Sequence, residues 1–126
     1  MRNLILITAL STLSAPAMAD VYDEQIASQC EDVKEVTYAS YINAQSGVAV
    51  ETTLVRLSSI YSNDNEFEFM ARFVKTAYTI PAPTIETSLK DAATTVGRIS
   101  RNACVKVLRE AVDGIIEDQS DDKVGM

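Results

Sequence analysis

The amino-acid sequence predicts an all-α fold, a compact bundle of four or five helices closed by one disulfide. Apolar residues recur every three or four positions through most of the chain, which is the spacing of one helix face. No segment of strand length alternates apolar with polar residues, as a half-buried strand would. Two cysteines, Cys30 and Cys104, bracket most of the chain and are expected to pair.

The first residues are typical of a secretory signal peptide. Arg2 supplies a positive charge, residues 4–13 form a short apolar run, and residues 17–19 (Ala-Met-Ala) have the small-x-small pattern of a cleavage site. A membrane-spanning helix needs about 20 apolar residues, roughly twice that run. We therefore expect cleavage between Ala19 and Asp20, no stable membrane anchor, and a mature protein that is periplasmic or secreted.

The two cysteines suit an oxidising compartment, where an isolated pair usually forms a disulfide. Cys30 and Cys104 stand 74 positions apart, and the loop-entropy model gives such a closure roughly 4 kcal/mol of stabilisation. The alternative is a pair of redox-active thiols, which usually occur at Cys-x-x-Cys spacing. Because that spacing is absent, we expect a structural disulfide that ties the first helix to the last.

Residues 20–116 are predicted to form a single helical domain, followed by an acidic, disordered tail over residues 117–126. In the first helix Asp23 and Glu24 suit the beginning, and Gly47 is expected to end it in a left-handed conformation. Its apolar stripe is Ile26, Cys30, Val33, Thr37, Tyr41 and Ala44. A second helix is expected over Val50–Tyr61.

The third helix is expected over Glu66–Thr79, with Asp64 or Asn65 as its N-cap. Two prolines in residues 81–83 stop the chain, and Thr84 is the expected cap of the last helix, which begins at Ile85. We expect Gly97 to kink or break this helix. The core stripe predicted for it is Leu89, Ala92, Val96, Ile99, Ala103, Val107, Ala111 and Ile115, widened by Cys104, Leu108 and Val112.

Composition excludes several kinds of chemistry. The chain has no histidine, which removes histidine-based nucleophilic catalysis and the commonest zinc ligand. The net charge is −7, and it becomes −8 when Arg2 is removed with the signal peptide, so nucleic acid is an unsuitable partner. Residues 63–66 and 117–122 are acidic but lack the spacing of a calcium loop. We therefore expect no enzyme activity, no metal and no cofactor.

Two groups of residues are candidate contacts for a partner protein. Arg98 and Arg101 begin a basic strip that continues to Lys106 and Arg109 on an otherwise acidic chain, although charge runs often only face water. Phe67 and Phe69 are two positions apart and so cannot share one helix face. We expect core roles for the aromatic residues, with one of this pair exposed as a contact.

The chain resembles two groups of bacterial proteins. An early cysteine, Gly47-Val48, an aromatic–Pro break at residues 78–81 and a late cysteine are similar to small uncharacterised exported proteins of Gram-negative bacteria, a group that implies a fold and no activity. Immunity proteins of type VI secretion share the same general build. The start Cys-Glu-Asp-Val at residues 30–33 resembles periplasmic acid-stress chaperones, although the cysteines of those proteins are closer together.

These observations favour a non-enzymatic protein-binding module of the bacterial envelope, acting as an inhibitor, immunity factor, adaptor or regulator. The expected partner is another envelope or secreted protein. An acid-activated chaperone is the alternative, because protonation of 18 carboxylates would reverse the net charge of the chain. A small cell-wall hydrolase that uses paired carboxylates is a second alternative, supported only by the compartment.

Overall fold

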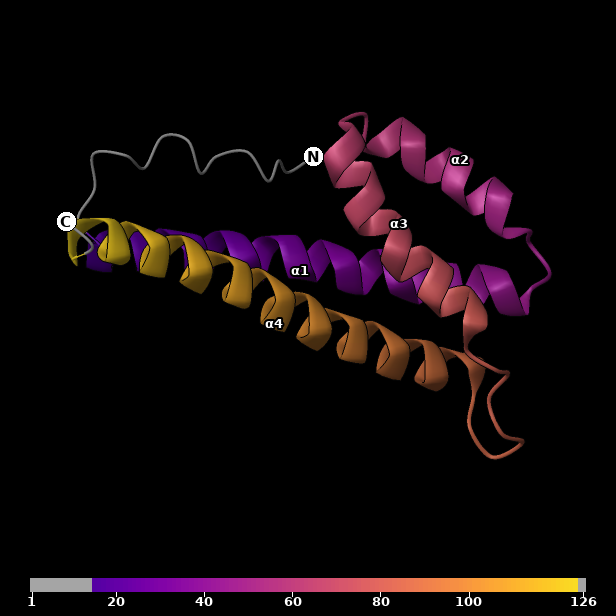
Figure 1. The fold of residues 1–126 in the computed structure, drawn as a ribbon. Helices are drawn as coiled ribbons and strands as arrows, with labels where there is room; N and C mark the ends of the chain where they lie inside the picture. The colour runs from indigo at the N-terminus through magenta and orange to yellow at the C-terminus, as the bar shows by residue number, and fades with distance from the viewer. Residues whose placement is uncertain (1–14, 125–126) are drawn as a thin grey trace.

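The protein is built on two long antiparallel helices, with two shorter helices packed at one end (Figure 1). The computed structural model describes the backbone of residues 15–124 and the side chains of residues 21–115. Within residues 15–124 there are four helices and no strand, so the predicted all-α bundle closed by a disulfide is confirmed. The helices are α1 (Ala15–Gln45), α2 (Val50–Ile60), α3 (Asp64–Thr79) and α4 (Leu89–Val124).

The predicted apolar stripe of the first helix is the buried face of α1. The stripe residues with less than a tenth of their surface exposed are Ile26, Cys30, Val33, Thr37 and Tyr41. The helix ends where Gly47 has a φ of 85°, and the amide of Val48 donates to the carbonyl of Asn43 at 2.9 Å. This hydrogen bond closes a Schellman motif, so the predicted left-handed conformation of Gly47 is confirmed.

The first turn of α3 is capped by a residue other than the two predicted. The side chain of Asn63 accepts hydrogen bonds from the amides of Asn65, at 2.9 Å, and Glu66, at 3.2 Å. An N-cap serves the amides two and three positions ahead, and Asp64 is already helical. The prediction of Asp64 or Asn65 as the cap was therefore wrong by one or two positions.

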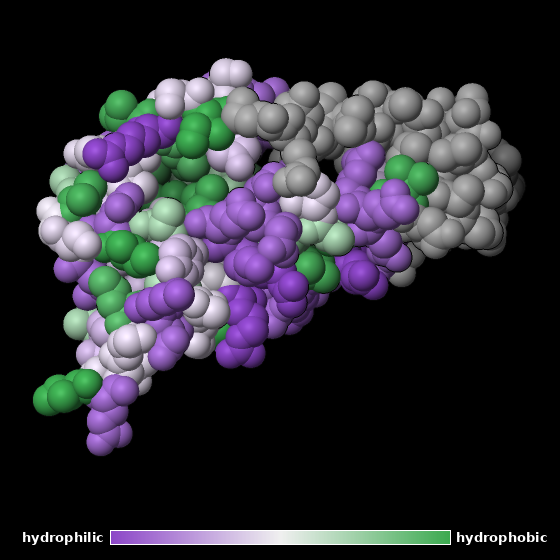
Figure 2. All heavy atoms as spheres, turned by 180° about the vertical axis from the view of Figure 1, so that it is seen from behind, coloured by the Kyte–Doolittle hydropathy of each residue, from purple (hydrophilic) through white to green (hydrophobic). Residues whose placement is uncertain are grey.

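A projecting loop over residues 80–88 connects α3 to α4 (Figure 1; lower left in Figure 2). The predicted proline break is confirmed, but Thr84 does not cap the last helix. The amide of Thr87 donates to the Thr84 carbonyl at 3.0 Å, which closes a turn. The cap is Ser88, whose hydroxyl accepts from the amide of Asp91 at 3.0 Å, so α4 begins at Leu89 and not at Ile85.

The main stripe predicted for the last helix is correct as far as Val96 and wrong beyond it. The three residues predicted to widen it, Cys104, Leu108 and Val112, do face inward. The positions that face inward from there are each one residue further along: Ser100, Cys104, Leu108 and Val112. Ile99, Ala103, Val107, Ala111 and Ile115 are exposed. The disulfide turns Cys104 toward α1, and a helix turns about 100° per residue. The residue before each inward position therefore faces away from the core.

The ends of the chain extend α1 and α4 beyond the predicted domain. Residues 1–14, most of the predicted signal peptide, lie outside the described residues, and residues 15–19 are the first turns of α1. α4 continues to Val124, so the tail predicted to be disordered from residue 117 is helical over 117–124. Its polar composition argues against a core position, but residues 117–124 contain no proline or glycine to stop a helix.

The disulfide lies at the centre of the main core. Cys30 and Cys104 are fully buried, and their sulfur atoms are joined at 2.06 Å. The other buried members of this cluster come from α1, α2 and α3 and include Ile26, Val33, Leu57, Met70 and Val74. A second cluster lies around Tyr41, whose hydroxyl donates to the carbonyl of Pro81 at 3.0 Å. α1 contributes to both clusters and therefore positions every other helix.

The surface seen from behind is predominantly hydrophilic across its middle. Hydrophobic side chains there are scattered over the end that carries α2 and α3 (Figure 2). No helix within the described residues is long and apolar enough to cross a membrane.

Candidate functional site

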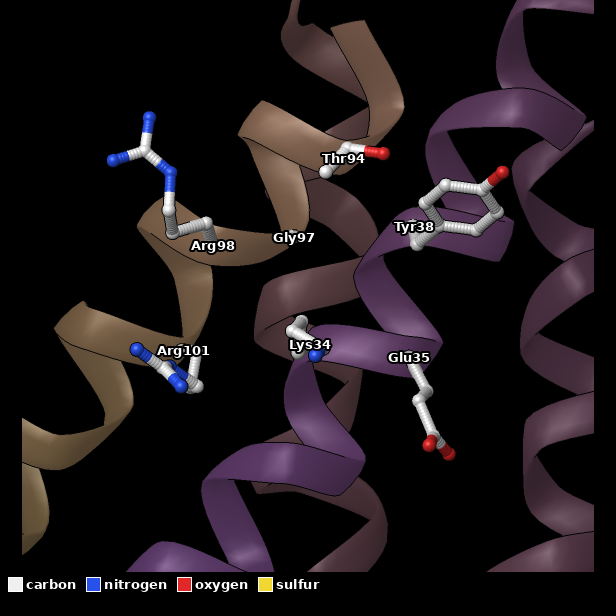
Figure 3. A pocket seen from close by; sticks show the side chains of 7 residues that line it. All are labelled: Lys34, Glu35, Tyr38, Thr94, Gly97, Arg98 and Arg101. Carbon is white, nitrogen blue, oxygen red and sulfur yellow. The ribbon is translucent and has the colours of Figure 1, made fainter. Parts of the chain in front are cut away.

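A groove runs along the seam where α1 meets α4 (Figure 3). Its volume is about 440 Å³, and the described residues that line it all come from these two helices. Figure 3 shows arginines on the α4 side, Tyr38 and Glu35 on the α1 side, and Lys34 between the two helices. The lining residues are Lys34, Glu35, Tyr38, Thr94, Gly97, Arg98 and Arg101.

Gly97 allows α1 and α4 to approach closely at this point. A Cβ atom added at position 97 would lie 2.9 Å from the carbonyl oxygen of Lys34 and 3.2 Å from its Cγ. Tyr38 is the next neighbour, with its Cβ at 3.6 Å. Only glycine therefore fits without moving the helices apart. α4 passes through Gly97 without a break, which corrects the expectation of a break.

Basic side chains dominate the charge of the groove. The ammonium group of Lys34 lies 2.6 Å from one carboxylate oxygen of Glu31, and the guanidinium of Arg101 lies 4.0 Å from the other. These three side chains are a little over two-fifths exposed, so water and salt screen the pairs strongly. Arg98 is exposed on the same side of α4 and extends outward in Figure 3.

A second depression of about 480 Å³ continues the groove toward the C-terminal half of α4. Arg101 lines both depressions, and Lys106 lines the second together with Glu31. We call the two depressions the cationic groove. It combines four basic side chains, Lys34, Arg98, Arg101 and Lys106, with two acidic ones, Glu31 and Glu35. The chain as a whole carries a net charge of −7, so the groove inverts the local sign.

The structure separates the two predicted groups of partner contacts. Arg98 and Arg101 both line the cationic groove. Phe67 and Phe69 lie on α3 and are both half-buried; the ring of Phe69 meets the edge of Phe73, with centroids 5.4 Å apart. α3 packs against both α1 and α2, so two neighbouring helices cover parts of its surface. The expectation that one of the pair is exposed was therefore wrong.

The C-terminal end of the basic strip pairs across the two long helices. The guanidinium of Arg109 lies 3.5 Å from the carboxylate of Asp23 on α1. Lys34 and Tyr38 were not predicted as members of the site. They become neighbours of Arg98 only when α1 is aligned against α4. The one signal in the sequence that marks this place is Gly97, a glycine within a helical pattern.

The groove offers cationic hydrogen-bond donors beside an aromatic ring. Arginine and lysine donate charge-assisted hydrogen bonds to carboxylates, and the Tyr38 ring offers an apolar wall beside them. Among the described residues, no group of three or more cysteine, aspartate or glutamate side chains is placed to hold a metal ion. Comparison of the chain with protein-family models, with curated proteins and with solved structures finds no match in any of the three.

Proposed function

We propose that this protein is an exported, non-enzymatic binding module of the bacterial envelope, and that it binds an acidic segment of a partner protein in the cationic groove. The observation that carries this proposal is the inverted sign of the groove. Four basic side chains surround it on a chain with a net charge of −7. The rest of the chain carries an excess of acidic residues, which disfavours an acidic segment except along this seam.

The groove is suited to an extended segment with several carboxylates. Its two depressions share Arg101 and follow the α1–α4 seam, so successive carboxylates of one segment can meet successive cations. The guanidinium groups of Arg98 and Arg101 can bind carboxylates in a two-pronged arrangement, which lysine cannot. The disulfide and Gly97 hold both helices in place before a partner arrives.

Export supports the same proposal. The disulfide is of the kind formed in oxidising compartments, and we propose that residues 1–19 are removed on export. Within this compartment the protein would act as an inhibitor, immunity factor, adaptor or regulator of another envelope or secreted protein.

A synthetic acidic peptide tests the proposal directly. Fluorescence anisotropy of a labelled Glu-rich peptide of about ten residues should show saturable binding to the exported protein at low salt. Replacing both arginines (Arg98→Glu with Arg101→Glu) should abolish that binding. The matched control (Lys75→Glu with Lys90→Glu) changes the net charge equally at exposed positions outside the groove and should retain most of it.

Three results would contradict the proposal. The first is no binding of the acidic peptide at any salt concentration. The second is equal loss of binding in both double variants, which would reflect net charge alone. The third is recovery of a stoichiometric partner from a periplasmic extract that binds the groove variant as well as the natural protein.

A further inference from the structure

A second apolar face runs along the outside of α4. Ile99 is 59% exposed, Val107 is 52% exposed and Ile115 is 43% exposed. Alanines that are also exposed stand between them. We call this set of residues the α4 stripe: Ile99, Ala103, Val107, Ala111 and Ile115. α4 packs chiefly against α1, so the described parts of α2 and α3 leave the stripe open.

We propose that the α4 stripe is the interface of an antiparallel homodimer of this chain. The stripe has the same sequence in both directions, Ile-Ala-Val-Ala-Ile at steps of four residues. An interface with two-fold symmetry must be complementary to itself, because each contact occurs twice. Successive stripe residues turn by about 40° around α4, so the stripe is a ridge of i, i+4 positions inclined to the helix axis. Two such ridges pack against each other when the helix axes cross at about 50°. With the two-fold axis at Val107, that crossing brings Ile99 of each copy closest to Ile115 of the other. The alanines face each other and let the helices approach closely.

Charges beside the stripe favour a second copy over another partner. Lys106 lies one residue from the proposed axis and Glu110 lies three residues from it, on the same edge of the stripe. Both residues therefore lie close to the two-fold axis, and in an antiparallel pair Lys106 of one copy lies within reach of Glu110 of the other. This ion pair forms twice. The same two residues thus make the edge of the stripe complementary to itself.

A small apolar pocket lies at the end of the α4 stripe, where Ile99 of the second copy would contact the protein. Its volume is about 110 Å³, and Ala111 and Ile115 of the stripe form part of its wall. The antiparallel alignment brings Ile99 of the second copy to this place. The other lining residues are Tyr22, Gln25, Ile26, Leu108 and Val112. The pocket offers each copy a recess for an isoleucine from the other.

The test is the oligomeric state of the exported protein, with its disulfide intact. Sedimentation equilibrium should show a dimer at about 100 µM that dissociates on dilution. Val107→Lys places two like charges at the axis and should give a monomer at every concentration. Val55→Lys is the matched control, because Val55 is 69% exposed on α2, and it should leave the dimer unchanged.

A charge exchange distinguishes this dimer from any other. Lys106→Glu alone, or Glu110→Lys alone, places like charges opposite each other and should weaken the dimer about tenfold or more. The two substitutions together restore opposite charges and should restore the dimer. A natural protein that is monomeric at about 100 µM overturns the proposal. So does a dimer that Val107→Lys leaves intact, or a double variant that fails to recover.

Discussion

Replacing Gly97 with alanine is expected to destabilise the fold, whereas the same change at Gly114 is expected to stabilise it. A Cβ at position 97 would lie 2.9 Å from the carbonyl oxygen of Lys34, and a Cβ at position 114 would meet nothing within 4 Å. The clashing oxygen belongs to the backbone, so it cannot swing aside as a side chain would. The clash is relieved only if α1 and α4 move apart along the seam that forms the cationic groove.

The expected changes in the free energy of unfolding combine a gain in helix propensity with a cost of overpacking. Both glycines are inside α4, so alanine gains up to about 1 kcal/mol of helix propensity at either position. At position 97 the added methyl group overpacks the seam, which costs about 1–3 kcal/mol. Gly114→Ala should therefore raise the free energy of unfolding by up to about 1 kcal/mol. Gly97→Ala should change it by between about zero and −2 kcal/mol.

Urea unfolding followed by far-ultraviolet circular dichroism measures the difference, with the disulfide intact. With a denaturant slope of about 1.5 kcal/mol per molar urea, the midpoints of the two variants should differ by about 0.7–2 M. Two equal midpoints, or a higher midpoint for Gly97→Ala, would show that Gly97 does not limit the approach of the helices. The close approach of α1 and α4 at the cationic groove would then not depend on Gly97.

Other predictions use the same unfolding measurement or the peptide assay. Replacing both Cys30 and Cys104 with alanine should lower the free energy of unfolding by roughly 4 kcal/mol; a loss below about 1 kcal/mol would refute the entropic estimate. Asn63→Ala removes the α3 cap and should cost about 1 kcal/mol, while Asn65→Ala should cost much less, and equal losses would contradict the capping geometry. Tyr41→Phe removes the hydrogen bond to the carbonyl of residue 81 and should cost about 1 kcal/mol, so an unchanged midpoint would exclude a role for that bond. Acidic-peptide binding should weaken about tenfold or more between ~50 and ~500 mM salt, and salt-independent affinity would argue against a charge-driven site.

Most of the fold follows from local patterns in the sequence. The stripe from Ile26 to Tyr41, the left-handed Gly47 and the proline break each depend on neighbours within a few residues, so the sequence alone predicts them. The N-caps of α3 and α4 were harder to predict, because residues 62–65 and 84–88 each hold several side chains able to cap a helix. Composition cannot choose among them. The choice depends on which backbone amides each oxygen reaches.

The rotation of α4 shows where periodicity is insufficient. Two adjacent apolar faces run along this helix, and counting every fourth residue cannot decide which one is buried. Cys104 decides it, because the bond to Cys30 turns that side of the helix inward. Ile99, Val107 and Ile115 fit the helical period as well as the buried residues do, yet they are exposed to solvent.

Predicting the cationic groove requires knowledge of both the disulfide and the antiparallel alignment of α1 against α4. The position of Arg98 and Arg101 follows from a basic strip within one helix. Lys34 and Tyr38 are distant in sequence, and only the alignment of α1 against α4 brings them to the same seam. Equal steps taken in opposite directions from the two cysteines place residue 37 opposite Gly97, which agrees with the contacts found there. A charge count along one helix contains no such information.

The pairing of α1 with α4 also sets the order in which the chain can fold. α1 is synthesised first and its principal partner α4 last, so the largest interface of the molecule joins the two ends of the chain. Contacts so distant in sequence slow folding, because the intervening loop must close before they form. Until α4 is complete, the apolar face of α1 lacks its principal cover and the thiol of Cys30 has no partner. Nascent chains therefore expose this apolar face to aggregation over much of their synthesis, and the bond between Cys30 and Cys104 can form only after most of the chain has been made.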